Sequence, residues 1–191
     1  MAHKFNPANK TKLDNQWRRQ SVPPIPTLEM LGLAAEDTVA DLGCGIGYFT
    51  IPAAEIVKAT NKVFALDTSK EMLAEVEKRS NLAGVSNVIL VKTEEYNLVL
   101  PDGSVSFALI VNVLHEIDDK ERFLQEARRI LKSAGRIAVI DWEKKQTEVG
   151  PPIDHRISIE ETKDMLEKTG YKLMKEMQLA GVFYGLVAVK Q

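Results

Sequence analysis

The chain lacks most features of disulfide-linked, nucleic-acid-binding or membrane-spanning proteins. Its single cysteine, Cys44, excludes an internal disulfide and any metal site built from several cysteines. Its 25 lysines and arginines stand against 27 acidic residues, so the formal net charge of -2 lacks the basic excess typical of nucleic-acid binding. No apolar segment approaches a membrane span or a secretory leader. We expect a cytoplasmic protein with no metal, no nucleic-acid partner and no stable membrane insertion.

The chain does contain enough apolar sequence for a core. With 45% hydrophobic and 27% charged residues in 191, it suits one globular domain, expected at residues 27–191. Before it, residues 1–26 form a basic arm that ends in a proline-stiffened linker. Asp14 is the one acid among its first 20 residues, against Lys4, Lys10, Lys12, Arg18 and Arg19. Such an arm is either solvated or a lid over a ligand pocket; the sequence leaves this choice and the oligomeric state open.

One stretch, residues 41–50, concentrates glycine in the sequence Asp-Leu-Gly-Cys-Gly-Ile-Gly-Tyr-Phe-Thr. An apolar run at residues 38–42 leads into it and a helical composition follows Tyr48, so it predicts a strand, a tight turn and a helix. Glycine allows a ligand to lie directly against the main chain. The helix N-terminus adds N–H groups that favour an anion. The stretch therefore predicts a nucleotide-type loop, with simple strand-to-helix packing as the plain alternative.

The glycine spacing and one acid distinguish between ligand classes. A dinucleotide loop has the pattern G-x-G-x-x-G, but counting from Gly43 places Tyr48 at the third glycine, and counting from Gly45 places Thr50 there. Asp41 would repel a pyrophosphate but suits a ligand with an ammonium and a sulfonium group. S-adenosylmethionine has both, and its carboxylate is expected at the helix N-terminus. The stretch resembles the first motif of the class I S-adenosylmethionine-dependent methyltransferases.

Further cofactor contacts are expected where the next strands end. Asp67 ends a strand predicted at residues 62–67, 20 residues after Gly47, which is the separation that places a carboxylate beside ribose hydroxyls. Acids follow a third strand at residues 88–91, and Asn112 lies near the end of a fourth at residues 105–113. The predicted cofactor-binding residues are Asp41, Gly43, Cys44, Gly45, Gly47, Tyr48, Asp67, Thr68, Met72, Thr93, Glu94, Glu95 and Asn112.

Alternating strand and helix patterns continue to the end of the chain. Helices are expected at residues 27–33, at 49–57, after Thr68 or Ser69, after Asp118 or Asp119, and from a Ser158–Glu161 capping box to residue 168. A fifth strand at residues 136–141 and a final hairpin of residues 171–178 and 183–189 complete the pattern. The expected fold is α/β, matching the Rossmann-like doubly wound sheet that the resemblance implies: seven strands, mostly parallel, with an antiparallel C-terminal hairpin strand.

Three further motifs narrow the resemblance, which spans residues 30–145. They read Leu-Pro-Asp-Gly-Ser-Val-Ser-Phe from residue 100, Asn-Val-Leu-His-Glu from residue 112 and Arg-Ile-Leu-Lys-Ser-Ala-Gly-Arg from residue 129. They are similar to the branch that includes quinone-biosynthesis and arsenite methyltransferases, most of which act on small molecules. Arsenite enzymes use several cysteines, so arsenic is not expected as the substrate. The resemblance implies methyl transfer from S-adenosylmethionine to an unidentified small molecule.

A sulfonium methyl donor is already activated, so the protein must mainly align a nucleophile with the methyl group and exclude water. A hydroxyl or a carbon acid also needs a general base. His115, just past a strand end on the ligand side, is the candidate catalytic residue. Substrate contacts are expected after the fifth strand and in the irregular insertion at residues 150–156, from Asp141, Glu143, His155 and Arg156.

Three alternative functions fit parts of this sequence pattern. A regulatory protein that binds the cofactor without catalysis is compatible with the same loop. A nucleic-acid methyltransferase is disfavoured by the charge, and because Asn112 is followed by Val-Leu-His rather than by Pro-Pro-Tyr. A nicotinamide oxidoreductase is disfavoured by the glycine spacing and by Asp41.

Overall fold

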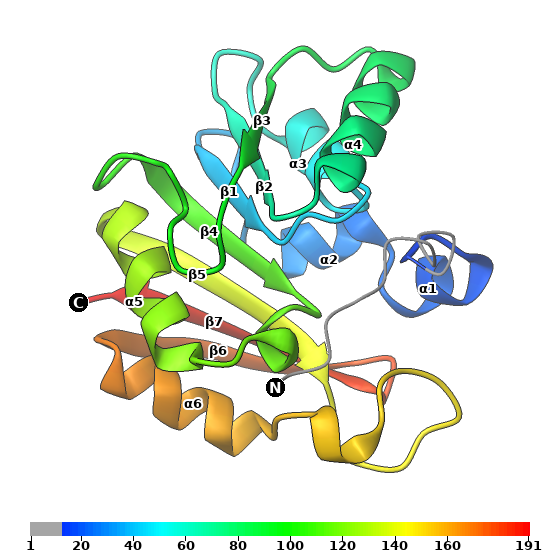
Figure 1. Cartoon of the computed structure of the whole chain (residues 1–191), viewed down its shortest axis with the longest axis vertical. Coiled ribbons are helices and arrows are strands. Elements are labelled where there is room, and N and C mark those ends of the chain that lie inside the picture. Colours follow the sequence, from blue (N-terminus) through cyan, green and yellow to red (C-terminus); the bar gives the residue numbers. More distant parts are fainter. Residues whose placement is uncertain (1–12) are drawn as a thin grey trace.

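The computed structural model describes residues 13–191 as one seven-stranded sheet with helices on both faces (Figure 1). The strand order is β3-β2-β1-β4-β5-β7-β6, in which β7 pairs antiparallel with β5 and β6 and the other pairs are parallel. The predicted Rossmann-like sheet is confirmed. The elements in order are α1 Gln16–Ser21, α2 Pro24–Met30, β1 Val39–Leu42, α3 Thr50–Ile56, β2 Val63–Asp67, α4 Lys70–Ala83, β3 Val88–Lys92, β4 Val105–Val111, η2 Leu114–Glu116, α5 Lys120–Ile130, β5 Leu131–Trp142, η3 Ile153–His155, α6 Ile159–Lys168, β6 Tyr171–Leu179 and β7 Phe183–Lys190.

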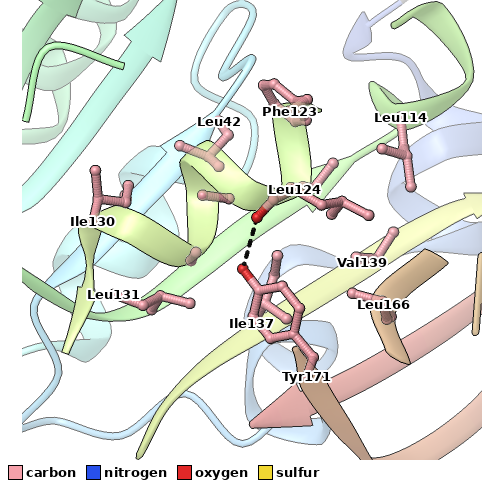
Figure 2. Close-up of a cluster of buried hydrophobic side chains, with 14 of the residues drawn as sticks. Leu42, Leu114, Phe123, Leu124, Ile130, Leu131, Ile137, Val139, Leu166 and Tyr171 are labelled. Atoms are coloured by element: carbon pink, nitrogen blue, oxygen red, sulfur yellow. Dashed lines mark hydrogen bonds between the residues drawn. The ribbon is translucent and has the colours of Figure 1, made fainter. Parts of the chain in front are cut away.

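Apolar strands at the centre of the sheet are covered on both faces. β1 is buried at every position, as a parallel strand between helix layers should be. Helices α2, α3 and α4 cover one face and α5 and α6 cover the other (Figure 1). In the core beneath α5, Tyr171 donates its hydroxyl to the Leu124 carbonyl at 3.1 Å, so this buried hydroxyl has a partner (Figure 2).

The strand order reverses between β1 and β4, and this reversal positions the site. The chain crosses from β1 to β2 on one side, and β4 lies on the other side of β1. Connections then leave the carboxyl ends of β1 and β4 in opposite directions, which opens a crevice where ligands of such sheets bind. The glycine stretch follows β1, and His115 follows β4.

Two predicted strand boundaries differ from the structure by more than one residue. β4 ends at Val111 rather than at residue 113, because Asn112 has a φ of 55° and turns the chain out of the sheet. β5 starts at Leu131 rather than at residue 136. Its pairing with β4 shifts register between Val105 and Phe107, so the first part of β5 is irregular and regular pairing starts at Arg136.

The basic arm lies partly outside the described residues, which begin at residue 13. The expected proline linker is wrong, because Pro24 and Pro26 lie in the first turn of α2, where proline costs no hydrogen bond. That helix ends at Met30, earlier than predicted. Val22 and Leu28 are buried in the same cluster as Phe49, so the chain packs on the domain from Val22 onward.

None of the described helices combines the length and apolar character that a membrane crossing requires. The longest of those in residues 13–191, α4, has 14 residues.

Candidate cofactor and acceptor site

A cleft of about 740 Å³ lies at the carboxyl ends of the parallel strands, within the usual size range of small-ligand sites. We call its two parts the cofactor side (the lining residues within 41–49, 67–72 and 93–95, with Asn112) and the acceptor side (His115, Phe123, Trp142 and the lining residues within 150–155, with Asp141 buried behind His115). Fourteen residues that the sequence singled out line this cleft: Asp41, Gly43, Cys44, Gly45, Tyr48, Asp67, Thr68, Met72, Thr93, Glu94, Glu95, Asn112, His115 and His155.

The glycine loop is held tightly against the end of β2. The N–H groups of Gly43 and Cys44 both donate to the Leu66 carbonyl, at 2.8 and 3.0 Å, and Gly45 donates to Asp67 Oδ2 at 2.9 Å. Gly43 has a φ of 73°, and a Cβ at this position would come within 2.6 Å of the Val113 side chain. The loop therefore requires glycine here for both its backbone torsion and its close approach to the chain after β4.

Asp41 is buried at the floor of the cofactor side. Its Oδ2 accepts a hydrogen bond from the Thr50 hydroxyl at 2.6 Å. Burial raises the pKa of Asp41 to about 7, although the Thr50 hydrogen bond opposes this increase. A carboxylate kept in such a place is stabilised by any cation that enters the cleft.

Asp67 lies at the end of β2, as predicted, and its carboxylate bridges two loops. Oδ1 accepts the Ser69 N–H at 2.8 Å, and Oδ2 accepts that of Gly45. Burial raises its pKa, while the backbone hydrogen bonds from Ser69 and Gly45 act against this. The Ser69 side chain caps α4 through Met72 N–H, which brings Met72 to the wall of the cleft.

Asn112 has two buried polar atoms that find no hydrogen-bond partner among residues 13–191. Both Oδ1 and Nδ2 are enclosed, and the residue lines the cleft directly after β4. Buried amide groups are normally paired because an unpaired one costs free energy. A ligand with both donors and acceptors near β4, such as an amino-acid group, would satisfy them.

His115 and Asp141 form a buried pair at the acceptor side. His115 Nδ1 lies 2.7 Å from Asp141 Oδ1, and Asp141 Oδ2 accepts the His115 backbone N–H at 3.2 Å. Because a carboxylate accepts hydrogen bonds, Nδ1 carries the proton and Nε2 presents a lone pair. Burial opposes the charged imidazolium, but the hydrogen bond and charge of Asp141 outweigh burial and raise the pKa of His115. Such a pair is an oriented base.

The remaining walls of the acceptor side are mostly apolar. They come from η2, α5, the end of β5 and the insertion that follows it: Ile117, Phe123, Trp142, Pro151 and Pro152. The Trp142 ring packs on Phe183, with centroids 4.3 Å apart, and stacks with the α1 residue Trp17 at 5.8 Å and an interplanar angle of 2°. Apolar walls around a base favour a flat, largely apolar acceptor.

Comparison with known proteins gives the family. A family model described as a methyltransferase domain matches residues 40–139. The chain belongs to this methyltransferase family. A crystal structure of an S-adenosylmethionine-dependent methyltransferase from Aquifex aeolicus is 31% identical, with a TM-score of 0.94 over 98% of this chain and 100% of that one.

Two curated relatives are similar over the same region. The ubiquinone/menaquinone biosynthesis C-methyltransferase UbiE of Pseudoalteromonas translucida is 31% identical over 70% of this chain and 51% of its own length. The demethylmenaquinone methyltransferase of Listeria welshimeri is 28% identical over 72% of this chain and 56% of its own. The methyltransferase thus spans about half the length of these relatives.

The cofactor of the methyltransferase is S-adenosylmethionine, and the cleft fits it. Two acids, Asp41 and Asp67, and the unpaired amide of Asn112 lie on the cofactor side. The sequence assigns them to the ammonium, the ribose and the methionine part of the cofactor. Their individual contacts remain predictions.

Four predicted site residues are not brought to the cleft. Gly47 is absent from the lining residues, and a Cβ at this position would lie 3.3 Å from Val76 on α4. Asp141 is fully buried and contacts His115, so it is no direct substrate contact. Glu143 is also absent from the lining.

The prediction for Arg156 as an anion-binding residue was wrong. Its guanidinium donates to five oxygen atoms of the loop between β5 and η3, belonging to Pro151, Glu143, Lys145, Thr147 and Val149. These bonds use the donors that a substrate carboxylate would need. Arg156 therefore holds the shape of this loop, and His155 beside it reaches the cleft instead.

The sequence left open whether residues 1–26 cover a ligand pocket, and it singled out no residue of α1 as a site residue. Leu13 and Arg18 line the cleft, and Trp17 lies on Trp142. The local basic composition was the only signal for Arg18, and no spacing rule connects a helix before the first strand with the end of β5. Among residues 13–191 no group of three or more histidine, cysteine or acidic side chains is placed to hold a metal ion.

Proposed function

We propose that the protein transfers a methyl group from S-adenosylmethionine to a small aromatic molecule, at a hydroxyl or an activated ring carbon, with His115 as the general base. The observation that carries this proposal is the 2.7 Å contact between His115 Nδ1 and Asp141 inside the cleft. An oriented histidine is needed where the acceptor must lose a proton, and contributes little where the acceptor is already a free nucleophile.

S-adenosylmethionine supplies an electrophilic methyl group on a sulfonium when it is bound. Asp41, Asp67 and Asn112 would hold it, beside the glycine loop that lines the same cleft. His115 would take the proton of the acceptor at Nε2, while Asp141 keeps Nδ1 protonated and stabilises the resulting charge. The apolar walls exclude water, which would otherwise solvate the nucleophile.

Two features support an aromatic acceptor. Phe123, Trp142 and the prolines of the insertion form flat apolar walls next to His115. Relatives of similar sequence are named for methylation in ubiquinone and menaquinone biosynthesis, where the acceptor is a quinone precursor by name. A quinol or phenol ring has the size, apolar faces and acidic hydroxyl that these walls and this base would suit.

The test is methyl transfer from methyl-labelled S-adenosylmethionine to a panel of quinols, phenols, amines and carboxylic acids. We expect labelled quinol or phenol products and slower or no transfer to amines. A protein that binds the cofactor by calorimetry but labels no member of the panel would instead support cofactor binding without catalysis. Preferred transfer to amines or carboxylates would remove the need for a base and contradict the proposal.

A further inference from the structure

Glu116 lies beside the candidate base His115 in the cleft. Its Oε1 is 3.7 Å from His115 Nε2, and both residues belong to the short helix η2. The backbone N–H of Glu116 donates to the Val113 carbonyl at 2.8 Å, which fixes the turn that carries the two side chains. Both residues line the cleft, and the Glu116 side chain is 22% exposed where that of His115 is 6% exposed. The carboxylate is therefore the more accessible of the two groups.

The two facing atoms of this pair are both hydrogen-bond acceptors. Asp141 holds the proton of His115 at Nδ1, so Nε2 presents a lone pair. At 3.7 Å, Nε2 and Glu116 Oε1 are too far apart to bond to each other, and neutral His115 has no proton to give there. An ionised carboxylate has about four acceptor positions, so it can accept from a ligand in addition to any partner within the chain. One molecule in the cleft can thus donate to both residues.

The walls around this pair are mostly apolar. A few placed polar groups in an apolar pocket fix the orientation of a ligand. A molecule that fills the acceptor side should therefore carry its polar groups together on one edge, next to His115 and Glu116, and present apolar surface elsewhere. The apolar wall residues are Ile117, Phe123, Trp142, Pro151 and Pro152.

The spacing of the two acceptor atoms distinguishes between hydroxylated rings. Neighbouring ring hydroxyls lie about 2.7 Å apart, so each can donate at ordinary length to one of two atoms that are 3.7 Å apart. Para hydroxyls lie at opposite ends of a ring. A para-diol that donates to His115 Nε2 would turn its second hydroxyl toward the apolar walls, where an unpaired hydroxyl costs free energy. A ring with one hydroxyl offers no second donor to Glu116.

We propose that the methyl acceptor is a ring with two neighbouring hydroxyl groups, and that Glu116 binds the hydroxyl that is not methylated. This inference rests on the proposed methyl transfer with His115 as the base. The reacting hydroxyl gives its proton to His115 Nε2 as its oxygen bonds to the methyl carbon, and the bond from that carbon to sulfur breaks to leave S-adenosylhomocysteine. The neighbouring hydroxyl keeps its proton and donates to Glu116 Oε1. Glu116 then determines both the acceptor class and the oxygen that reacts.

The test compares three probes that share one ring: catechol with neighbouring hydroxyls, hydroquinone with para hydroxyls, and phenol with one. Calorimetry on the full chain saturated with S-adenosylhomocysteine, under anaerobic conditions, gives their affinities. We expect catechol to bind about 10- to 100-fold more tightly than the other two, the range for a hydrogen bond to a charged group. Glu116→Met should reduce this preference to about twofold or less. The loss of charge beside His115 affects all three probes, so the ratio of affinities isolates the contact.

Asp154→Met is the matched control, because it removes the carboxylate that lies 4.0 Å from Nε2 of the other histidine of the acceptor side, His155. It should leave the preference for catechol unchanged. Equal affinity of the wild-type protein for the three probes, or a preference that survives Glu116→Met, overturns the proposal. If Glu116→Met fails to fold, the wild-type comparison still decides, and Glu116→Gln, which keeps one acceptor oxygen, should retain part of the preference.

Methyl transfer to catechol is measured separately with methyl-labelled S-adenosylmethionine. Labelled product that depends on both His115 and Glu116 supports the two proposals together. A preference for catechol that depends on Glu116, without labelled product, would support the Glu116 contact and contradict the proposed methyl transfer. Efficient labelling of phenol or hydroquinone with no preference for catechol would leave the methyl transfer in place and overturn the role of Glu116.

Discussion

The cofactor side of the cleft is built by residues close to strand ends, whereas the acceptor side is built by residues far apart in the chain. Gly43, Asp67 and Asn112 each lie within a residue or so of the end of β1, β2 or β4. The acceptor side depends instead on pairs such as His115 with Asp141 and Trp17 with Trp142. A parallel sheet fixes where its strand ends lie, so the first set follows from the topology. The second set depends on tertiary packing.

This difference has a functional meaning. Any member of the family must bind the same cofactor, which a sheet edge and a glycine loop can provide. The acceptor varies, and it is met by loops and helix ends whose shape depends on distant contacts. We therefore expect substitutions on the acceptor side to alter turnover and leave cofactor binding intact. Substitutions on the cofactor side should weaken cofactor binding and leave turnover intact.

His115→Ala should separate the effect on turnover from the effect on cofactor binding most clearly. Loss of a general base lowers kcat by about 100- to 10,000-fold, while the Kd for S-adenosylmethionine should stay within about twofold. Single-turnover kinetics and calorimetry measure the two quantities. His155→Ala serves as the control, because His155 also lines the cleft but lacks the Asp141 contact that orients a base. A large loss of cofactor affinity in His115→Ala would show that the two sides are not separable.

Asp141→Asn should produce a smaller loss with a distinct pH signature. Asp141 acts only through His115, so its loss should not exceed the roughly 100- to 10,000-fold decrease in kcat expected for His115→Ala. Asp141 raises the pKa of His115, so the wild-type rate should rise with pH through a value above that of ordinary histidine. Asparagine removes that charge while burial remains, so the acidic limb of the kcat profile should move to lower pH. An unshifted limb would mean that His115 does not titrate in the rate-determining step.

The sequence predicted the seven-stranded, mostly parallel sheet and most of the residues that line the cofactor side. It could do so because strand ends and glycine turns are local features. The sequence placed Asp141 and Arg156 in the cleft from their positions in the chain alone. It did not indicate that the polar atoms of both side chains form hydrogen bonds within the protein. Those hydrogen bonds are tertiary contacts. For the same reason the sequence singled out neither Arg18 nor Trp17, although it allowed residues 1–26 to cover the pocket.

Asp41→Asn tests the cofactor side because it should raise the stability of the protein and weaken cofactor binding. Asp41 has a pKa of about 7 in the folded protein, against an ordinary aspartate pKa of 3.8. The unfolded chain therefore loses this proton first, and stability falls as pH rises between these values. At pH 8 the asparagine variant without ligand should melt several degrees higher, and at pH 4 or below, where Asp41 is largely neutral in both states, about the same as wild type. Its affinity for S-adenosylmethionine should fall about tenfold, because the ammonium loses a charged partner. Higher stability with unchanged affinity would remove Asp41 from the ammonium site.

The smallest expected effect concerns the attachment of α1, where the two sides of the cleft meet. Asp14 pairs with both Arg19 and Arg79, at 2.7 and 2.8 Å, and although burial acts against it these arginines lower the pKa of Asp14. Partly exposed pairs contribute about 0.2 to 1 kcal/mol, so Asp14→Asn should weaken S-adenosylhomocysteine binding only about two- to fivefold. The depressed pKa means that this contribution is present at neutral pH and lost as pH falls below the ordinary range of aspartate. Glu160→Gln, which alters an exposed ion pair on α6 away from the cleft, is the control. Equal affinity of Asp14→Asn and wild type at pH 7 would show that α1 needs no anchor to α4.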